Sequence, residues 1–353
     1  MSLQKTNRDN GDSMKKILIA GIGGASLGTE IHKSLLLSGK YVVYGCDIER
    51  LAYGHFVESF EKTFIVNRSV YVKEVIDICA HNGISYIIPG AEEPMVLLNS
   101  AMNELDSAGI SLIGNSPEVV DVFSNKESTF KTLSGLGFAV PKTLKYAKTS
   151  DLEHMPYPAI IKPSKGSGGS SFVFFANCKK EAQIYVDYLQ SNDKEPLVQE
   201  YIPEDEGEYT VGVLNSPSGD LIGSIALKRE FPNKLSISSK LKNGMISSGY
   251  TQGLIGKFPH IEGTAEKISL AINSKGPINV QGRVRNGVFV PFEINPRFSS
   301  STYFRALAGF NEIDLLIEHM ETGKCVLQEN LRYGYYLRSF TEVYVKKELI
   351  HID

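Results

Sequence analysis

Four polar residues in the last third of the chain have types and spacings that suit chemistry. The four are Gln281, Glu293, Asn295 and Arg297. Two apolar segments, 279–284 and 288–295, predict a β-hairpin around them. Side chains alternate between the two faces of a strand, so the acid, the amide and the guanidinium, spaced by two, project on one side. Phe292 and Ile294 then project into the core.

The oxygens of this set are hard ligands. Mg²⁺ prefers carboxylate and amide oxygens at about 2.1 Å and leaves positions for waters and substrate phosphates. The guanidinium of Arg297 can grip a phosphate oxygen through two hydrogen bonds. The pattern therefore favours metal-bound phosphate, with Gln281, Glu293 and Asn295 as metal ligands. The plain alternative is an edge ribbon with a solvated polar face.

The place of Gln281 depends on the hairpin turn. A two-residue turn would put Gln281 opposite Phe292, on the wrong face. A three-residue turn, 285–287, that ends in a left-handed Gly287 brings Gln281 beside Glu293. We predict the three-residue turn. A two-residue turn without a bulge would remove Gln281 from the site.

An apolar run, 159–161, leads into Lys162, and a second apolar run, 172–176, follows a loop rich in glycine and serine. The loop residues are Gly166, Ser167, Gly168, Gly169, Ser170 and Ser171. Glycines let backbone N–H groups approach an anion closely, and the neighbours of Lys162 would bury its ammonium unless it meets an anion. The loop lacks P-loop spacing. The alternative is a flexible surface hairpin.

A third segment, 197–202, is a short apolar strand that ends before Pro203. The carbonyl of Glu200 and the N–H of Ile202 suit the edge of adenine, with Tyr201 between them, and the carboxylate of Glu208 suits ribose hydroxyls. For the acidic residues 204–206 we favour a solvated loop.

The order and spacing of these pieces resemble the ATP-grasp superfamily. The resemblance covers residues 14 to about 324 and is strongest to one synthetase half of the carbamoyl-phosphate synthase large subunit and to stand-alone carboxylate–amine ligases. It implies that Lys162, the glycine loop and Lys126, which precedes a helix, contact ATP phosphates. It also implies an adenine hinge at residues 200–202 and a ribose acid at Glu208.

The resemblance further implies the roles at the hairpin and the cofactors. Gln281, Glu293 and Asn295 match the metal ligands, and Arg297 matches a residue beside the γ-phosphate. Arg297 and Lys162 are the expected catalytic residues. The implied cofactors are ATP and Mg²⁺, with Mn²⁺ as a substitute. Catalysis would rest on positioning and charge, so we assign no nucleophile and no general base.

The expected fold class is α/β, with α+β character in the lid. Strands that alternate with helices over residues 14–123 predict a Rossmann-like domain with a parallel sheet. The resemblance implies that an ATP-grasp fold of two α+β subdomains clasping ATP follows over residues 124–327, with a lid at about 142–200. Residues 1–13 are expected to be a tail, and aromatic residues within 328–353 predict strands that complete the domain.

The glycines after the first predicted strand are also compatible with a different function. Gly21, Gly23 and Gly28, followed by Asp47, approach the fingerprint of a dinucleotide-binding domain, whose acid holds the ribose of NAD. The spacing is imperfect because Ser26 occupies the place of the third glycine. The resemblance explains the same glycines without a nicotinamide, so an NAD-dependent oxidoreductase is a minor alternative.

Five further residues are candidate substrate contacts: Gly23, Glu92, Glu93, Arg229 and Gly249. Glu92 and Glu93 suit an amine, but an acidic pair at the start of a helix is equally favoured by the helix dipole. Segment 235–249 is rich in Ser, Lys and Gly. It is either a substrate loop or a disordered surface excursion, and we favour the second.

Charge, apolar runs and cysteine content indicate which kinds of partner and compartment suit this chain. A net charge of −3 across 353 residues gives no general attraction to nucleic acid. No apolar run approaches the roughly 20 residues of a membrane span, and no signal peptide precedes the first strand. The 4 cysteines are scattered without a Cys-x-x-Cys pair, which indicates reduced thiols in a cytoplasmic protein.

Taken together, the sequence predicts an ATP-dependent ligase. It would phosphorylate a small-molecule carboxylate to an acyl phosphate and couple it to an amine, releasing ADP and phosphate. One alternative is a carbamoyl-phosphate-synthase-like subunit that acts on bicarbonate or carbamate, and another is an idle ATP-binding module. A homodimer is usual among similar proteins.

Overall fold

The N-terminal part of the chain forms a parallel sheet. In the computed structural model, which describes residues 14–165, 172–231, 234–325, 330–347 and 350, its five strands lie in the order β3-β2-β1-β4-β5. The strands are β1 Lys15–Ala20, β2 Tyr41–Asp47, β3 Lys62–Ile65, β4 Tyr86–Pro89 and β5 Ser111–Leu112. The order changes direction between β1 and β4, as in a doubly wound fold, so the predicted parallel sheet is confirmed.

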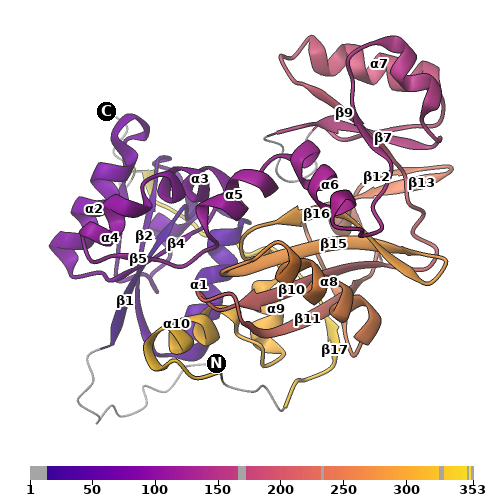
Figure 1. The fold of residues 1–353 in the computed structure, drawn as a ribbon. Helices are drawn as coiled ribbons and strands as arrows, with labels where there is room; N and C mark the ends of the chain where they lie inside the picture. The colour runs from indigo at the N-terminus through magenta and orange to yellow at the C-terminus, as the bar shows by residue number, and fades with distance from the viewer. Residues whose placement is uncertain (1–13, 166–171, 232–233, 326–329, 348–349, 351–353) are drawn as a thin grey trace.

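Helices cover both faces of this sheet (Figure 1). They are α1 Leu27–Ser38, α2 Tyr71–Asn82, α3 Glu92–Ser100, α4 Met102–Ser107 and α5 Pro117–Phe123, with short 3₁₀ turns η1 Tyr53–Phe56 and η2 Arg68–Val70. Alternate residues of β1 serve the two faces. Ile17 and Ile19 pack in one cluster with α1, whereas Leu18 and Ala20 pack in another with α2 and α3.

A second, antiparallel sheet follows. Its four strands lie in the order β6-β9-β7-β8. They are β6 Thr143–Lys145, β7 Ala159–Pro163, β8 Phe174–Ala176 and β9 Pro196–Glu200. Helix α7, Lys179–Gln190, packs on this sheet through Ala182, Val186 and Leu189. Helix α6, Lys126–Gly135, and the 3₁₀ turn η3, Thr149–His154, precede its central strand β7.

The largest sheet is antiparallel and has the order β16-β15-β10-β11-β14-β17. Its strands are β10 Glu208–Asn215, β11 Leu221–Arg229, β14 Gly253–Ile255, β15 Pro277–Arg285, β16 Val288–Asn295 and β17 Gly334–Tyr336. Helix α8, Pro259–Ala271, packs on one face. Helices α9, Thr302–Leu307, and α10, Glu312–Thr322, pack between the other face and the N-terminal sheet, which joins both sheets in one apolar core.

Segment 235–249 is not the disordered excursion that we favoured. It forms η5 Lys234–Ser236 and a two-stranded hairpin, β12 Ile237–Leu241 and β13 Gly244–Ser247. Ile246 is buried against Phe175 of β8 and Tyr201, which directly follows β9. The backbone of Gly244 approaches Tyr201 so closely that a Cβ there would lie 2.7 Å from the ring. The polar sequence hid this contact because only two of its residues are buried apolar side chains.

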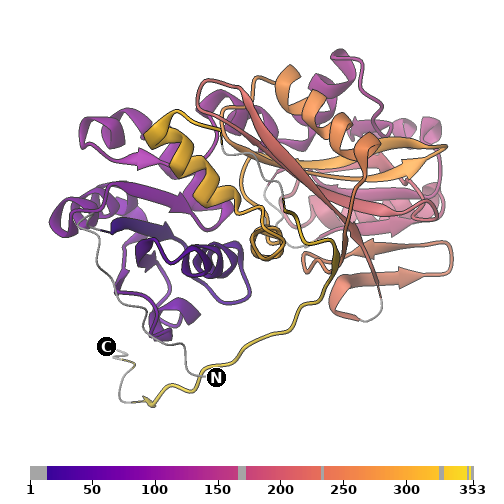
Figure 2. The same cartoon turned by 90° about the horizontal axis from the view of Figure 1, so that it is seen from below.

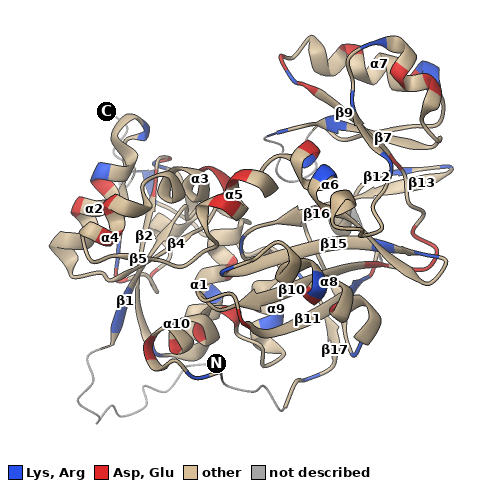
Figure 3. Ribbon diagram, in the orientation of Figure 1, with Lys and Arg blue, Asp and Glu red and all other residues tan. Residues whose placement is uncertain are grey.

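The C-terminal segment contributes less sheet than predicted. Of its described residues only Gly334–Tyr336 form a strand, β17, which pairs with β14. The following residues run as an extended segment along the side of the molecule drawn at the bottom of Figure 2. Figure 3 shows both basic and acidic residues on α2 and on α7. No described helix combines the length and the apolar character that crossing a bilayer requires.

Candidate active site

A cavity of about 370 Å³ lies where the three sheets meet. Its walls come from the loop before α1, from β7 and β9, from the segment after β13, and from the β15–β16 hairpin with the loop that follows it. The polar and charged residues in its lining include Lys126, Lys162, Gln199, Glu200, Asn279, Gln281, Arg283, Glu293, Asn295, Arg297 and Arg338. Segments more than 200 residues apart therefore meet in one chamber.

The hairpin contradicts the predicted three-residue turn but keeps Gln281 in the site. Arg285 pairs with Val288, and Asn286 and Gly287 have φ of 52° and 72°, so the turn has two residues, both left-handed. A bulge between Gln281 and Gly282 then shifts the register, and Gln281 pairs with Glu293. No pattern in the sequence predicts this bulge.

The same bulge redirects Phe292. The pairing passes from Glu293 to Pro291, so Phe292 has no partner across the hairpin. Its side chain lines the cavity instead of the core, which corrects our expectation, whereas Ile294 is buried in the core as predicted. An extra residue on one strand re-aims the side chains beside it.

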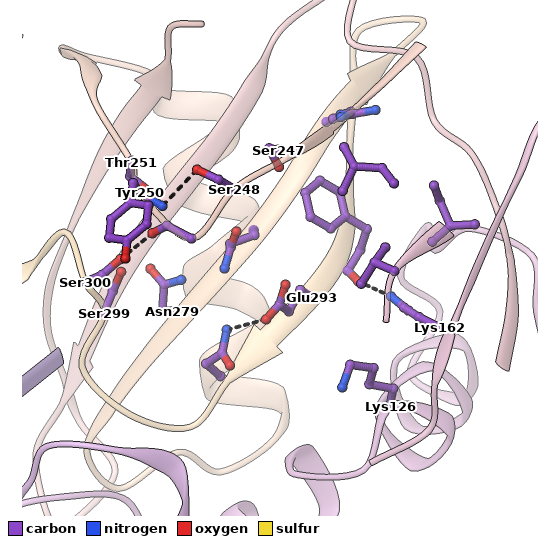
Figure 4. A pocket seen from close by; sticks show the side chains of 18 of the residues that line it. Lys126, Lys162, Ser247, Ser248, Tyr250, Thr251, Asn279, Glu293, Ser299 and Ser300 are labelled. Atoms are coloured by element: carbon purple, nitrogen blue, oxygen red, sulfur yellow. Dashed lines mark hydrogen bonds between the residues drawn. The ribbon is translucent and has the colours of Figure 1, made fainter. Parts of the chain in front are cut away.

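Glu293, Asn295 and Arg297 form a chain of contacts at the end of β16. Asn295 Nδ2 donates to Glu293 Oε1 at 3.1 Å, and a dashed line marks this bond at Glu293 in Figure 4. Arg297 Nη2 donates to Asn295 Oδ1 at 3.2 Å. Arg297 Nη1 donates to the Phe298 carbonyl at 2.9 Å. Burial lowers the pKa of Arg297, against the attraction of Glu293 and Glu92. The three groups are thus held side by side on the cavity wall.

The predicted ligand set fits magnesium chemically. One carboxylate and two amides offer hard oxygens. The described part of the chain contains no group of three His, Cys, Asp or Glu side chains that would hold a metal without further ligands. A divalent ion at Gln281, Glu293 and Asn295 would therefore need anionic oxygens from a ligand.

Lys162 is buried with neutral partners. Its Nζ donates to Gln199 Oε1 at 2.8 Å and to the Phe292 carbonyl at 3.4 Å, and it lies 5.4 Å from the centre of the Phe130 ring. Burial, and next the charge of Lys126, lower the pKa of Lys162 to about 7, although Glu293 opposes the shift. Such a lysine gains most from an anion that enters the cavity.

Lys126 is positioned by the start of α6. The Asn125 side chain caps this helix by accepting from Glu127 N at 2.9 Å, and Lys126 N donates to the Ser164 carbonyl at 3.0 Å, which ties the helix to the end of β7. Lys126 and Arg297 also line a smaller cavity of about 60 Å³ beside the main one. The predicted glycine loop, 166–171, lies outside the described residues.

The expected adenine edge also lines the cavity. Glu200, Tyr201 and Ile202 lie beside Ile160, Val173, Met245 and Ile246, which supply apolar surface. The Glu200 carboxylate accepts from Arg285 Nη1 at 2.6 Å, and Met245 N donates to the Tyr201 hydroxyl at 2.9 Å. These contacts hold the end of β9 against β13 and β15. This part of the cavity is therefore a slot, with apolar side chains on one side and the end of β9 on the other.

Glu208 and Arg229 are not on the cavity wall but pair with each other, so the structure does not bring them to the ribose and substrate positions that we predicted. Glu208 is 1% exposed, and its oxygens accept from Arg229 Nη1 at 2.9 Å and Arg283 Nε at 2.8 Å. Burial opposes its ionisation, but the two guanidinium groups outweigh burial and lower the pKa of Glu208. Arg283, which sequence reasoning missed, does line the cavity.

The structure places the other candidate substrate residues in different surroundings. Gly249 lines the main cavity, and Glu92 lines the smaller one. Glu93 instead forms an exposed ion pair with Arg68 at 2.5 Å and lines neither cavity, so the structure does not bring it to the site. Both acids lie in the first turn of α3, as the helix-dipole alternative expects. Gly23 lies outside both described linings, although its neighbours 25–27 contribute to the main one.

The glycines of the dinucleotide-like loop serve packing. Gly28 N donates to the Gly90 carbonyl at 3.0 Å, and a Cβ on Gly28 or on Gly90 would lie 2.0 Å from the Gly21 carbonyl oxygen. Asp47 Oδ2 accepts from Ile22 N at 2.8 Å. The point where the strand order changes is therefore filled by closely packed backbone.

Sequence reasoning also missed Arg338. It lines the cavity from the C-terminal segment, in a stretch that we expected to add strands and no chemistry. A single arginine among aromatic residues was the only signal in the sequence.

Comparisons with known proteins agree with this geometry. A family model described as "ATP-grasp domain" matches residues 123–301. The carbamoyl phosphate synthase large chain of Sulfolobus acidocaldarius is 24% identical over 338 residues, which is 87% of this chain and 29% of that protein. The chain thus spans less than a third of the length of this relative.

Solved structures share the fold. The biotin carboxylase domain of Hydrogenobacter thermophilus 2-oxoglutarate carboxylase, a dimer with MgADP and bicarbonate, has a TM-score of 0.66 at 15% identity and covers 92% of this chain and 74% of that one. The L-amino acid ligase of Bacillus licheniformis has a TM-score of 0.63 at 15% identity, with coverage of 86% and 73%.

Proposed function

This chain belongs to the ATP-grasp family, and from that premise we propose that it is an ATP-dependent ligase. It phosphorylates a small-molecule carboxylate to an acyl phosphate and couples the acyl group to an amine, with release of ADP and phosphate. The observation that carries the proposal is the meeting of Lys126, Lys162, Arg297 and the Gln281–Glu293–Asn295 oxygens on the wall of one cavity.

Charge explains why these residues suit phosphoryl transfer. ATP carries about four negative charges at neutral pH, and an approaching carboxylate adds another, so uncompensated repulsion would prevent attack. Lys126 and Arg297 bring two positive charges to the cavity, and Lys162 adds a third when a phosphate favours its protonated form. Gln281, Glu293 and Asn295 would hold Mg²⁺, which supplies further positive charge to the phosphates when bound.

The protein's part is to hold and orient the reactants. Asn295 keeps Arg297 beside Glu293, so the guanidinium is in place before the nucleotide arrives. Gln199 holds the Lys162 ammonium at the end of β7. The slot at residues 200–202 receives the adenine. No described side chain needs to act as a covalent nucleophile.

The comparisons support ATP and Mg²⁺ as the cofactors, and Mn²⁺ would suit the same oxygens. The structurally similar biotin carboxylase domain is described with MgADP and bicarbonate, and another similar structure is an L-amino acid ligase. We therefore favour a carboxylic acid and an amine as substrates. The similarity to carbamoyl phosphate synthase over 87% of this chain keeps bicarbonate or carbamate as a second candidate.

We place the enzyme in the cytoplasm, free of nucleic acid and membrane, and in a homodimer like that of the biotin carboxylase domain. Cys46 and Cys79 are free and buried, and burial raises the pKa of both thiols to about 12, which makes them unreactive. Structural thiols of this kind suit a reducing compartment.

The test is release of ADP and phosphate from Mg-ATP with a panel of carboxylic acids, amines and bicarbonate. We expect release that requires one acid and one amine. Tight Mg-ATP binding without release across a broad panel would instead indicate an idle ATP-binding module. Quenched NAD(P)H fluorescence without any effect of Mg-ATP on thermal stability would revive the oxidoreductase.

A further inference from the structure

A third arginine of the cavity wall, besides Arg283 and Arg297, comes from the C-terminal segment and meets helix α1 of the N-terminal domain. Arg338 follows β17, and its side chain is only 9% exposed although it lines the cavity. Nε donates to the Thr251 carbonyl at 3.2 Å, and Nη2 donates to the Ser300 carbonyl at 2.5 Å. The guanidinium lies 4.7 Å from the centre of the Phe304 ring. The group is thus held from several sides.

The charge of Arg338 is only partly compensated. Its Nη1 lies 3.0 Å from Glu30 Oε1, on helix α1 of the N-terminal domain. The same carboxylate oxygen accepts from Lys33 Nζ at 2.9 Å. One acid therefore serves two cations, and the group of Lys33, Glu30 and Arg338 has a net charge of plus one. Of the three, only Arg338 lines the cavity.

Arg338 also keeps donors for a ligand. A guanidinium has five N–H groups, and the two hydrogen bonds above use one on Nε and one on Nη2, while Nη1 is ion-paired with Glu30. At least one N–H group on Nη1 and one on Nη2 are not used by these contacts, and this pair matches the two oxygens of a carboxylate. A buried cation with two unused donors beside a cavity is suited to an anion.

Arg338 lies at a different end of the cavity from Lys126 and Lys162, the lysines proposed to bind phosphate. In Figure 4, Thr251, Ser299 and Ser300 lie on one side of Glu293, and Lys126 and Lys162 lie on the other. The carbonyls of Thr251 and Ser300 are the ones that Arg338 contacts, so its guanidinium belongs to the first side. Asn295 links Arg297 to Glu293, so in the proposed function the reacting carboxylate lies at Glu293 and Arg297, and Arg338 is left for a different group.

We propose that Arg338 is the anchor for a second anionic group of the substrate, so that the acid activated by this enzyme is a small dicarboxylate or an amino acid with two carboxylates. This inference rests on the proposed function and names its substrate class. The C-terminal segment also shapes the pocket through Phe340, whose ring lies edge-on to Tyr250 at 5.1 Å. Arg338 is thereby a specificity residue supplied by the C-terminal segment.

The experiment measures binding rather than turnover. The full chain with saturating Mg-ADP is titrated calorimetrically with matched probes, namely succinate against succinamate, glutarate against glutaramate, aspartate against asparagine, and glutamate against glutamine. We expect at least one dianion to bind about 10- to 100-fold more tightly than its monoamide, because a charge-assisted hydrogen-bonded pair is lost in the amide. In Arg338→Gln this preference should fall below about twofold, with Mg-ADP affinity unchanged.

Three variants separate anchoring from a structural role. Arg332→Gln removes a positive charge from an exposed position of the same C-terminal segment and should keep the full preference. Arg338→Lys keeps the ion pair with Glu30 but loses the paired donors, so it should fold and lose most of the preference. Glu30→Gln removes the carboxylate that competes for Arg338 and should leave the preference equal or larger.

Two results would overturn the inference. One is a wild-type chain that binds every dianion and its monoamide equally, and the other is an Arg338→Gln chain that keeps the wild-type preference. If Arg338→Gln does not fold, Arg338→Lys decides between the same outcomes. Failure of the proposed function is a separate result, because it is absence of substrate-dependent ADP release and leaves the charge preference measurable.

Discussion

Glu208 and Lys162 are both buried ionisable side chains, but their surroundings differ. Glu208 lies between two guanidinium groups, those of Arg229 and Arg283, each within 2.9 Å. Lys162 contacts an amide oxygen and a backbone carbonyl, and the nearest charge effects on it come from Lys126 and Glu293. The first group is neutralised by the protein, whereas the second has its charge left for a ligand.

Buried charges in this chain therefore fall into two classes, those that stabilise the fold and those that are available to a ligand. A buried ion that the protein pairs is a structural element whose loss exposes its partners to an uncompensated environment. A buried ion beside a cavity with only neutral partners destabilises the folded chain until an anion arrives. Arg305, paired with Glu312 at 3.0 Å, belongs to the first class, and Arg297 belongs to the second.

The largest expected effect is on catalysis. Arg297→Ala should reduce ADP formation by roughly 10³-fold, because it removes a fixed charge from the place where phosphate charge develops. The folded state should persist, since Arg297 contacts only an amide and a carbonyl oxygen. Initial rates of ADP release and far-UV circular dichroism measure the two quantities. Arg68→Ala, at an exposed pair, is the control, and full turnover by Arg297→Ala would break the comparison.

The second largest expected effect is the loss of stability when Glu208 is neutralised. Glu208→Gln should lower the free energy of unfolding by about 3 kcal/mol, because Arg229 would remain buried without a counter-charge and Arg283 would keep only Glu204, at 3.7 Å. Urea unfolding measures this value. The matched control is Glu293→Gln, which should change stability by less than about 1 kcal/mol while abolishing activity. Equal stabilities for the two variants would show that Glu208 is not structural.

The pH dependence of stability should reveal Lys162. Its pKa is about 7 in the folded chain and near 10.5 when unfolded, so the unfolded chain binds more protons between these values. Stability relative to Lys162→Met should therefore rise as pH increases from about 7 towards 10.5, and the penalty should be fully present below pH 7. Urea unfolding of both chains at several pH values measures the trend. A stability difference that does not vary with pH would mean that the protein compensates the charge of Lys162, as it does that of Glu208.

Nucleotide binding should change the protonation of Lys162. An anionic phosphate beside Lys162 favours the ammonium, so Mg-ATP binding near pH 8 should take up a proton from the buffer. Titration calorimetry in buffers of different ionisation enthalpy measures this uptake. Lys162→Met should bind Mg-ATP more weakly and take up less of a proton; unchanged uptake would assign the proton to another group.

The smallest expected effect is at the hairpin turn. Gly287→Ala should destabilise the chain by about 1 kcal/mol because Gly287 has a φ of 72°. Turnover should not change, since the turn lies at the far end of the hairpin from Glu293. Thermal unfolding and ADP release measure the two. A loss of turnover would mean that the turn, and not the bulge, sets the register at Gln281.

The alternation of apolar residues and the glycine positions were enough to predict the parallel N-terminal sheet and the strands that carry Lys162 and Glu293. Each of these depends on local periodicity, which a strand or helix imposes on its own sequence. The place of Glu208 could not be predicted in this way. Its carboxylate suits ribose as well as it suits arginine, and only the packing of β10 between β11 and β15 brings Arg229 and Arg283 to it.

The sequence by itself determined the chemical inventory: a lysine at the end of an apolar strand, one acid and two amides at matching spacings, and a guanidinium two residues beyond. The tertiary structure alone decided which charges meet. It placed the bulge that returns Gln281 to Glu293, buried Glu208 away from the cavity, and brought Arg338 to Glu30 across 308 positions of the chain. Residue types and periods are local properties, whereas the pairing of charges depends on distances that only the packed sheets set.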